Sequence, residues 1–347
     1  MSSLYRVGIV GASGYGGGEA LRLLARHPNV EIAYAMSDRF TGKRVGAVHP
    51  NLRHLELTFA PHAEAERAEV DAIVHAGPHG TAAPRMRTYL KAAGRVVLDL
   101  SADHRLADPA AYPPFYDGWT HPDPELLVQR AYGIAELHRD EIRRARLVSG
   151  AGCIATASIL ALAPLAQRGL IEDRVVVDAK VGSSAAGAEP GLASHHPERR
   201  DALRSYAPTG HRHTAEIRQE TGLREVGLSC TAVELVRGIL ATSHVWLKED
   251  LDEREIWKLY RAAYGSEPFV RIVKEKQGMW RYPEPKLLHG TNLCHIGFER
   301  DPLSRRLVVL SAIDNLGKGT AGAAVQNLNL ALGLPETTGL DQEGLHP

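Results

Sequence analysis

Cysteine is scarce in this chain, and long apolar runs are missing altogether. The 347 residues hold three cysteines, Cys153, Cys230 and Cys294, too few for a disulfide framework. No two of them have the CxxC spacing of a structural zinc site, so we expect no bound metal. No apolar run reaches the ~18 residues of a membrane span, and residues 1–6 lack the features of a secretory signal. We therefore expect a cytoplasmic protein.

An excess of charge of either sign is missing as well. The 41 lysines and arginines balance 41 aspartates and glutamates, so the net charge is zero when the histidines are neutral. This balance provides no general attraction to nucleic acid or to a membrane surface. With 44% hydrophobic and 24% charged residues the chain has the composition of a globular enzyme, and its length suits two domains.

The first 150 residues alternate between strand-like and helix-like patterns. Apolar, β-branched runs predict strands at 6–10, 30–36, 71–76 and 95–100, and leucine or alanine spacing predicts helices at 19–26 and 81–93. Such βαβ alternation is typical of a parallel sheet with helices on both faces.

After residue 153 the pattern changes. A long apolar helix is predicted at 154–169, and strands follow in series at 174–183, 225–236, 239–247 and 307–314. Strands with few helices between them favour a mixed or antiparallel sheet, and hence a second domain. Further helices are predicted at 251–265 and 320–332, and the polar residues after Pro335 are expected to fray.

A glycine-rich segment follows the first predicted strand. It reads Gly11-Ala-Ser-Gly-Tyr-Gly-Gly17, a GxxGxxG variant of the dinucleotide fingerprint. Glycines permit a tight turn and close approach to a pyrophosphate, whose charge the helix N-terminus favours. The predicted cofactor residues of this segment are Gly11, Ser13, Gly14, Tyr15, Gly16 and Gly17.

The second predicted strand ends in Ser37, Asp38 and Arg39. An acidic residue here usually holds the ribose of NAD, whereas arginine accommodates the 2′-phosphate of NADP. Both residue types are present, and Ser37 with Arg39 favours NADP(H).

Cys153 is the predicted nucleophile. It follows Gly150-Ala-Gly152 and precedes an apolar helix, and a helix N-terminus favours the thiolate form. The two glycines leave room around the thiol and, we expect, free backbone N–H groups for an oxyanion. An inert buried cysteine is the alternative, and it is the interpretation we favour for Cys230 and Cys294.

The nucleophile needs a base, and the run Gly210-His-Arg-His-Thr214 offers His211 and His213. Which of the two acts stays open at this point. Arg199, Arg200, Arg204 and Arg212 make this neighbourhood basic. Either it is a solvated face, or it binds an acidic substrate or partner.

Taken together, these motifs resemble the N-acetyl-γ-glutamyl-phosphate reductase family, within the aspartate-semialdehyde dehydrogenase-like superfamily. The resemblance covers nearly the whole chain and includes Leu98-Asp-Leu-Ser-Ala-Asp103 and Asp314-Asn-Leu-Gly-Lys-Gly-Thr320. It implies an α/β fold with a Rossmann-like NADP-binding domain at 1–152 and 316–347. It also implies an α+β catalytic and dimerisation domain at 153–315. In addition it implies that Asn315 and Gly317 reach the cofactor, and that the protein is a homo-oligomer, a dimer or tetramer, with the second sheet at the interface.

One motif departs from the arginine-pathway members of that family. They usually read Gly-Cys-Tyr-Pro-Thr, whereas this chain reads Gly152-Cys-Ile-Ala-Thr156, similar to the lysine-pathway branch. That branch reduces an α-aminoadipate phosphate carried by a small acidic amino-group carrier protein of the LysW type, which the basic arginines would suit.

The resemblance thus implies NADPH-dependent reduction of an acyl phosphate to a semialdehyde through a cysteine thioester, in lysine biosynthesis. N-acetylglutamyl phosphate or the carrier-linked glutamyl phosphate is the alternative substrate, because one methylene is worth only ~1–3 kcal/mol of discrimination. A non-catalytic NADP-binding redox sensor is an alternative of another class, but it would leave the base without a role.

Overall fold

The computed structural model describes residues 4–346, which form two compact units. The first unit holds residues 4–113, 118–151 and 320–341, and the second holds 114–117, 152–319 and 342–346. The domain boundaries predicted from the sequence stay a prediction, because compactness does not test independent folding.

The first unit contains a seven-stranded sheet in which every pair of neighbours is parallel. Its strand order is β3-β2-β1-β4-β5-β7-β6. The strands are β1 (Tyr5–Val10), β2 (Val30–Met36), β3 (Phe59–Ala60), β4 (Val70–His75), β5 (Ala93–Asp99), β6 (Ala131–Tyr132) and β7 (Leu147–Ser149). The predicted parallel sheet is therefore confirmed.

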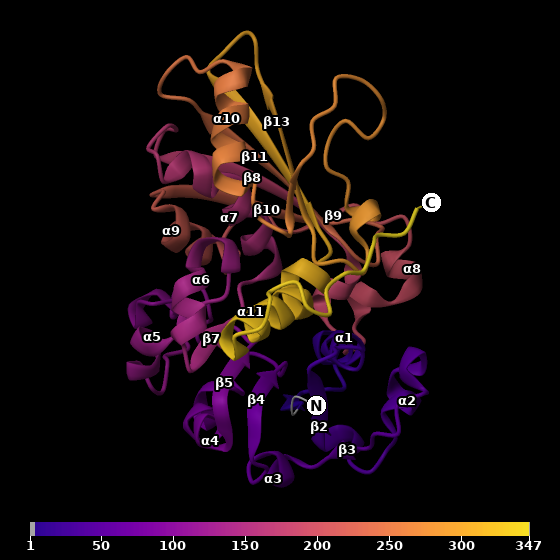
Figure 1. Cartoon of the computed structure of the whole chain (residues 1–347). Coiled ribbons are helices and arrows are strands. Elements are labelled where there is room, and N and C mark those ends of the chain that lie inside the picture. Colours follow the sequence, from indigo (N-terminus) through magenta and orange to yellow (C-terminus); the bar gives the residue numbers. More distant parts are fainter. Residues whose placement is uncertain (1–3, 347) are drawn as a thin grey trace. The chain divides into compact units, whose positions relative to one another are not determined.

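The order of the strands reverses between β1 and β4. Figure 1 shows the strands β2, β3, β4, β5 and β7 of this sheet. The chain runs from β1 outward to β2 and β3, and then returns to place β4 on the other side of β1. At such a switch point the loops at the carboxyl ends of the strands diverge and leave a crevice where ligands bind. The glycine segment and the segment after β4 both lie at this edge.

The helices of the first unit are α1 (Tyr15–Leu24), α2 (Val45–Val48), α3 (His62–Ala65), α4 (Met86–Ala92), α5 (Glu125–Gln129), α6 (Ala135–Arg144) and α11 (Gly322–Leu332). The predicted start of the first helix at 19 is wrong, because the glycines that lower helix propensity form its first turn. The predicted helix at 81–93 is shorter, since a 3-10 turn occupies Ala83–Arg85 and β5 begins at Ala93.

The C-terminal helix α11 packs within the first unit. The Asn327 side chain donates to the carbonyl of Gly133 (3.0 Å), and the Tyr5 hydroxyl donates to that of Leu332 (3.2 Å). The expectation that the residues after Pro335 fray is wrong. Leu340 is buried, and the Asn329 amide donates to the carbonyls of residues 336 and 338, which ties the tail to the helix.

The second unit contains a mixed seven-stranded sheet of order β12-β13-β14-β11-β8-β10-β9. Its strands are β8 (Arg174–Val181), β9 (Arg204–Ala207), β10 (Glu225–Ala232), β11 (Ile239–Trp246), β12 (Val270–Ile272), β13 (Cys294–Arg300) and β14 (Arg306–Ile313). The β8/β10 and β12/β13 pairs are parallel and the others antiparallel, as the sequence predicted for this part of the chain. The short strands β9 and β12 and the strand β13 were not predicted.

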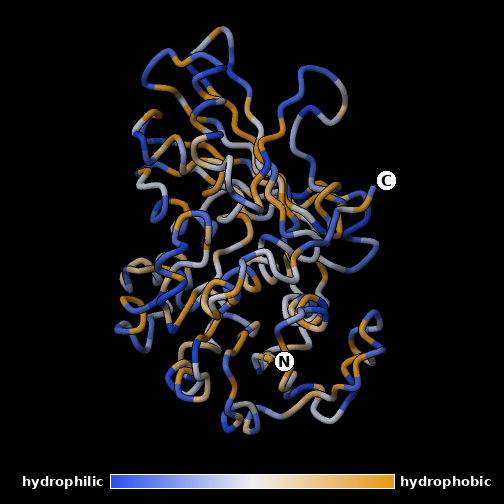
Figure 2. Tube along the Cα trace, in the orientation of Figure 1, coloured by the Kyte–Doolittle hydropathy of each residue, from blue (hydrophilic) through white to orange (hydrophobic). Residues whose placement is uncertain are grey.

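The helices of the second unit are α7 (Cys153–Ala166), α8 (His196–Arg199), α9 (His213–Thr221) and α10 (Glu253–Tyr264). Helix α7 is apolar on all sides and buried from Ile154 to Leu165, as a central core helix should be. The hydroxyls of Ser311, Tyr260 and Tyr264 donate to its carbonyls at 2.6–2.7 Å, which fixes its position against β14 and α10. Within this unit the long loops beside β13 are largely hydrophilic (Figure 2).

Short 3-10 turns complete the two units, and a π-helical turn, Gly317–Ala321, precedes α11. The 3-10 turns not yet named are Asp38–Phe40, Pro50–Leu52, Pro109–Ala111, Ser183–Ala186, Leu192–Ser194 and Pro285–Leu288. Among residues 4–346 we find no helix with the length and apolar character needed to cross a bilayer.

Candidate active site

The glycine segment of the first unit has the geometry of a dinucleotide loop. Gly11 has a φ of 74°, which L side chains rarely adopt, and a Cβ there would lie 2.7 Å from the backbone of Ala76 and Gly77. A Cβ at Gly17 would lie 2.4 Å from the Gly11 carbonyl oxygen. Helix α1 then begins at Tyr15 with no acidic residue in its first turn, so its N-terminus suits an anion.

The end of β2 lies beside this loop. The hydroxyls of Ser13 and Ser37 are 2.8 Å apart, which brings two predicted cofactor residues together. The Asp38 carboxylate accepts the backbone N–H of His62 (2.9 Å), and the Arg39 guanidinium lies 5.2 Å from the Phe40 ring centroid. Ser37, Asp38 and Arg39 therefore all lie at the end of β2 beside the dinucleotide loop, where a ribose 2′ substituent would be met.

Cys153 is the first residue of α7, in the second unit. Gly152 caps the helix, and its carbonyl accepts the N–H of Thr156 (2.7 Å). The first turn holds no acidic residue, so the helix N-terminus favours a thiolate here. Cys230 and Cys294 are fully buried, and burial raises the pKa of the Cys230 thiol to about 11, as expected of inert cysteines.

The expectation that Gly150 and Gly152 provide free N–H groups for an oxyanion is wrong. The Gly150 N–H donates to the carbonyl of Asp99 (2.7 Å), and the Gly152 N–H donates to the Glu216 carboxylate (2.8 Å). The first turn of α7 itself contributes N–H groups next to Cys153 that have no partner within a helix.

Glu216 is a functional candidate that the sequence analysis missed. Its side chain is completely buried on α9, where one carboxylate oxygen accepts the Gly152 N–H and the other lies 3.8 Å from Nε2 of His213. It therefore links the predicted base to the residue just before the nucleophile. The spacing of His213 and Glu216, three residues apart on one helix, was the available signal.

The two predicted base candidates lie together. His213 is the first residue of α9 and is buried, and a Cβ at Gly152 would lie 2.3 Å from its Nε2 atom. The His211 ring centroid is 4.6 Å from that of His213, and His211 Nδ1 accepts the His213 N–H (3.2 Å). His213 thus contacts the residue next to Cys153, whereas His211 faces a cavity.

That cavity, about 660 Å³ in volume, lies wholly within the second unit. His211 and three of the four predicted arginines, Arg199, Arg204 and Arg212, line it. Two acidic side chains, of Asp117 and Glu189, also line it, so it is basic overall but not uniformly so.

Arg200 is the fourth predicted arginine, and it is not among the residues that line the cavity. Its guanidinium pairs with the carboxylates of Glu234 (2.9 Å) and Asp201 (3.4 Å). Among the lining residues, Arg199 donates to the carbonyl of Val233 and Arg204 donates to that of Glu198 (2.7 Å). The four arginines that the sequence analysis grouped together therefore do not form a single surface, because three of them line the cavity and Arg200 does not.

Tyr206, on β9, also lines the cavity and was missed by the sequence analysis. Burial, with the neighbouring Cys230 and Cys153 thiols, raises the pKa of Tyr206 above its usual range. A tyrosine hydroxyl keeps its proton at neutral pH even without this shift, so that of Tyr206 can donate a hydrogen bond. A single tyrosine in an unpredicted edge strand carried no signal in the sequence.

Asn315 and Gly317 belong to the second unit, and their contact with the cofactor stays a prediction. The Asn315 amide donates to the Ser184 hydroxyl (2.9 Å) and accepts the Gly238 N–H (2.7 Å). A Cβ at Gly317 would lie 2.0 Å from the Thr291 carbonyl oxygen. Both residues therefore hold neighbouring loops of this unit together.

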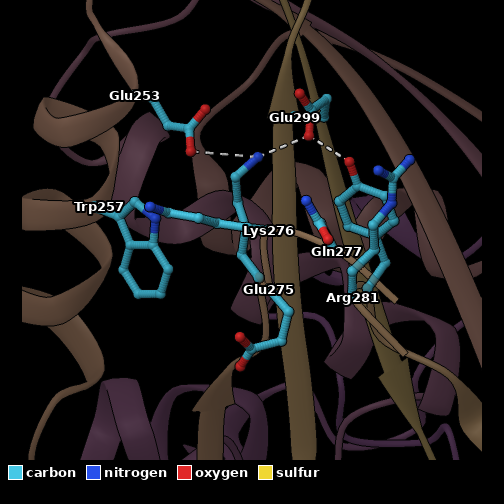
Figure 3. Close-up of a pocket in the computed structure, with 9 residues that line it drawn as sticks. Glu253, Trp257, Glu275, Lys276, Gln277, Arg281 and Glu299 are labelled. Atoms are coloured by element: carbon cyan, nitrogen blue, oxygen red, sulfur yellow. Dashed lines mark hydrogen bonds and ion pairs between the residues drawn. The ribbon is translucent and has the colours of Figure 1, made fainter. Parts of the chain in front are cut away.

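A second cavity, about 1060 Å³ in volume, lies between α10 and β13 (Figure 3). Its most buried charge, the ammonium of Lys274, pairs with Glu299 (2.7 Å) and Glu253 (3.5 Å). No predicted site residue lines this second cavity, whereas His211 lines the first. Cys153, His213 and Glu216 are not among the residues that line the first cavity.

Known proteins resemble both units of this chain. Residues 6–145 match the family model described as the NAD binding domain of semialdehyde dehydrogenase, and residues 153–315 match its dimerisation domain. A protein of Thermomicrobium roseum named "Putative [LysW]-L-2-aminoadipate 6-phosphate reductase" is 54% identical, with 98% of this chain and 99% of the relative covered. The "[LysW]-L-2-aminoadipate 6-phosphate reductase" of Deinococcus radiodurans is 50% identical, with 98% of each covered.

Solved structures show the same fold at low sequence identity. Aspartate semialdehyde dehydrogenase II of Vibrio cholerae superimposes with a TM-score of 0.72 at 17% identity, covering 95% of this chain and 99% of that one. The Candida albicans aspartate semialdehyde dehydrogenase solved with NADP gives 0.70 at 15% identity, covering 95% and 99%. The predicted resemblance is confirmed: this chain belongs to the semialdehyde dehydrogenase family, in the branch of the LysW-linked aminoadipate phosphate reductases.

Proposed function

We propose that this protein reduces the acyl phosphate of a carrier-linked α-aminoadipate to the semialdehyde, with NADPH as the reductant, in lysine biosynthesis. The observation that carries the proposal is that His213 and Glu216 both lie against Gly152, the residue before Cys153 at the start of α7, in the same unit as a basic cavity. The names of the relatives support this substrate class.

The chemistry of each step follows from the residues at the start of α7. His213, or His211, accepts the Cys153 proton as the sulfur bonds to the acyl carbon and the acyl–phosphate bond breaks, and it passes that proton to the departing phosphate. NADPH, when bound, supplies the hydride that reduces the resulting thioester. N–H groups of the first turn of α7 stabilise the oxyanion, and its collapse releases the aldehyde and the Cys153 thiolate.

The dinucleotide loop of the first unit is where we propose that the cofactor binds. Gly11, Gly14 and Gly17 provide the close approach to the pyrophosphate, and Ser37 with Arg39 provides the contact to the 2′-phosphate of NADP.

The basic cavity supports a carrier-linked substrate over a free one. Arg199, Arg204 and Arg212 line it together, and its volume of about 660 Å³ is that of a site for a whole ligand. An acidic carrier that presents its C-terminal residue would meet these cations. Carrier-linked glutamyl phosphate would fit equally well, because one methylene is worth only ~1–3 kcal/mol.

Two further properties belong to this proposal. We propose a homo-oligomer with the second unit's sheet at the interface, which the description of residues 153–315 as a dimerisation domain supports. We also place the reaction in the cytoplasm, in keeping with three cysteines that form no disulfide.

Reduction of NADP by aldehyde in the presence of inorganic phosphate tests the function in the reverse direction. The substrates to compare are aminoadipate semialdehyde linked to an acidic LysW-type carrier, the carrier-linked glutamate semialdehyde, and free N-acetylglutamate semialdehyde, each with NADP and with NAD. We expect phosphate-dependent turnover with carrier-linked aminoadipate semialdehyde and NADP. Turnover mainly with the free acetylated aldehyde would assign the protein to arginine biosynthesis and contradict the proposal.

Charge reversal at Arg204 tests carrier docking. Because Arg204 lines the cavity and is exposed, Arg204→Glu should raise KM for the carrier-linked aldehyde about tenfold and leave KM for a free aldehyde unchanged. Arg200→Glu is the matched control, since Arg200 pairs with Glu234 and does not line the cavity. Equal changes in KM for the two variants, or for the two aldehydes, would refute docking at this cavity.

A further inference from the structure

Two buried aspartates, one at the carboxyl end of β5 and one just after it, lie in the first unit, and the proposed mechanism uses neither. Asp99, the last residue of β5, is completely buried. Its carboxylate accepts hydrogen bonds from Nδ1 of His104 (2.6 Å), Nδ1 of His75 (3.2 Å) and the N–H of Ser101 (2.9 Å). Burial alone would raise the pKa of Asp99, but these hydrogen bonds outweigh it and hold the pKa well below its usual range.

Asp103 lies four residues further along and is also completely buried. One carboxylate oxygen accepts the N–H of Gly80 (2.6 Å) and Nδ1–H of His79 (2.6 Å). The other accepts the N–H groups of Ala82 (3.0 Å) and Ala83 (2.9 Å). An ionised carboxylate has roughly four lone-pair positions, and these four donors occupy them, so the hydrogen-bond acceptor capacity of Asp103 is saturated.

All four donors lie in residues 76–83, the segment that follows β4, which we name the β4 loop. A loop of this length has many conformations of its own, and one buried anion that binds its N–H groups selects a single one. The hydrogen bonds from the loop, with that from His79 the strongest influence among them, outweigh burial and lower the pKa of Asp103.

The start of the β4 loop forms the support of the Gly11 turn. The N–H of Ala76 donates to the Val10 carbonyl (2.8 Å), and a Cβ at Gly11 would lie 2.7 Å from the carbonyl carbon of Ala76 and the nitrogen of Gly77. The imidazole of His75 lies directly against Gly77, where a Cβ would be 2.8 Å from it. Asp99 thus fixes the first part of the loop through His75, and Asp103 fixes the last part.

We propose that Asp103 is a positioning residue for the cofactor, which holds the β4 loop as one wall of the NADP site. The proposal rests on the proposed function for the identity of the ligand. Its physical basis is that the loop lies at the β1/β4 switch point and directly supports the Gly11 turn. A loop that is already ordered loses less conformational entropy when the cofactor binds.

Asp103→Asn is the test, because the amide keeps the shape of the side chain but replaces one acceptor oxygen with a donor that faces the loop's own N–H groups. We expect the Kd for NADPH, measured by fluorescence titration without substrate, to rise about tenfold or more. KM for NADPH should rise equally, whereas kcat at saturating NADPH and KM for the aldehyde should change by less than twofold.

Asp108→Asn is the matched control. Asp108 lies five residues further along, is exposed, and caps a 3-10 turn by accepting the N–H of Ala110 (2.8 Å). It should leave the Kd for NADPH unchanged. If Asp103→Asn fails to fold, His79→Ala removes one of the four donors and should give a smaller rise in the same Kd.

The outcomes separate this inference from the function itself. A folded Asp103→Asn or His79→Ala variant with the wild-type Kd for NADPH would overturn the inference and leave the proposed function intact. Equal losses in kcat, KM for the aldehyde and NADPH affinity would also overturn it, because they indicate general damage to the fold. A wild-type protein that does not bind NADPH would instead refute the proposed function.

Discussion

Replacement of Cys153 by alanine is expected to lower phosphate-dependent reduction of NADP by about 10⁴-fold or more, because alanine cannot form the proposed thioester. NADPH affinity should stay at the wild-type value, since the dinucleotide loop belongs to the other compact unit. Steady-state assay and fluorescence titration of the same preparation measure both. The covalent mechanism predicts, in addition, that wild-type protein treated with an acyl phosphate analogue without NADPH gains one acyl group by mass spectrometry.

Cys230→Ala provides the matched control for Cys153→Ala. Cys230 is completely buried in β10, and burial raises its pKa to about 11, so its thiol stays protonated and unreactive at neutral pH. Turnover by this variant should remain within a few fold of wild type. Substantial steady-state turnover by Cys153→Ala, or acylation lost in Cys230→Ala instead, would contradict the assignment of the nucleophile.

Replacement of Glu216 by glutamine is expected to lower kcat by about 10²-fold or more, the scale of general acid–base catalysis. Glutamine retains an oxygen that can accept the Gly152 N–H, so the start of α7 should keep its position. It replaces the carboxylate oxygen that lies 3.8 Å from Nε2 of His213, and with it a charge that would stabilise the imidazolium while the proton is in transit. We expect unchanged KM for NADPH and an unchanged melting temperature.

Glu220→Gln is the corresponding control, because Glu220 lies one turn further along α9 and accepts a hydrogen bond from its neighbour Gln219 (2.8 Å). It should keep wild-type kcat. A Glu216→Gln variant with full kcat would show that the carboxylate serves only to hold Gly152. A Glu216→Ala variant, which removes both functions, should then lose stability as well as activity.

The sequence predicted the elements whose periodicity is strong. The alternation of buried strands and helices predicted the parallel sheet, and the serial strands after Cys153 predicted a mixed one, as the structure has them. Prediction from the sequence failed at positions where local helix propensity and tertiary packing favour different structures. Helix α1 begins in a run of glycines because close packing against the Gly11 turn, and not helix propensity, decides that position. The tail beyond Pro335 is ordered because Asn329 binds its carbonyls, which no local pattern reveals.

The candidate site, like the fold, was predicted only in part from the sequence. By residue type and motif, the sequence alone predicted Cys153 as the nucleophile, His213 or His211 as the base, and a glycine loop for the cofactor. It could not assign hydrogen bonds, and so it counted the Gly152 N–H as free when Glu216 already binds it. It also grouped Arg200 with three arginines that line a cavity, although Arg200 pairs elsewhere.

The sequence by itself therefore determined the chemistry available to this protein, because side-chain type and spacing set which groups can act as nucleophile, base or anion binder. Only the tertiary structure decided which of those groups are already hydrogen-bonded or ion-paired within the protein. Glu216 and Asp103 show the reason. Each is an ordinary acidic residue in the sequence, and each becomes significant only when folding buries it among N–H donors contributed by distant segments.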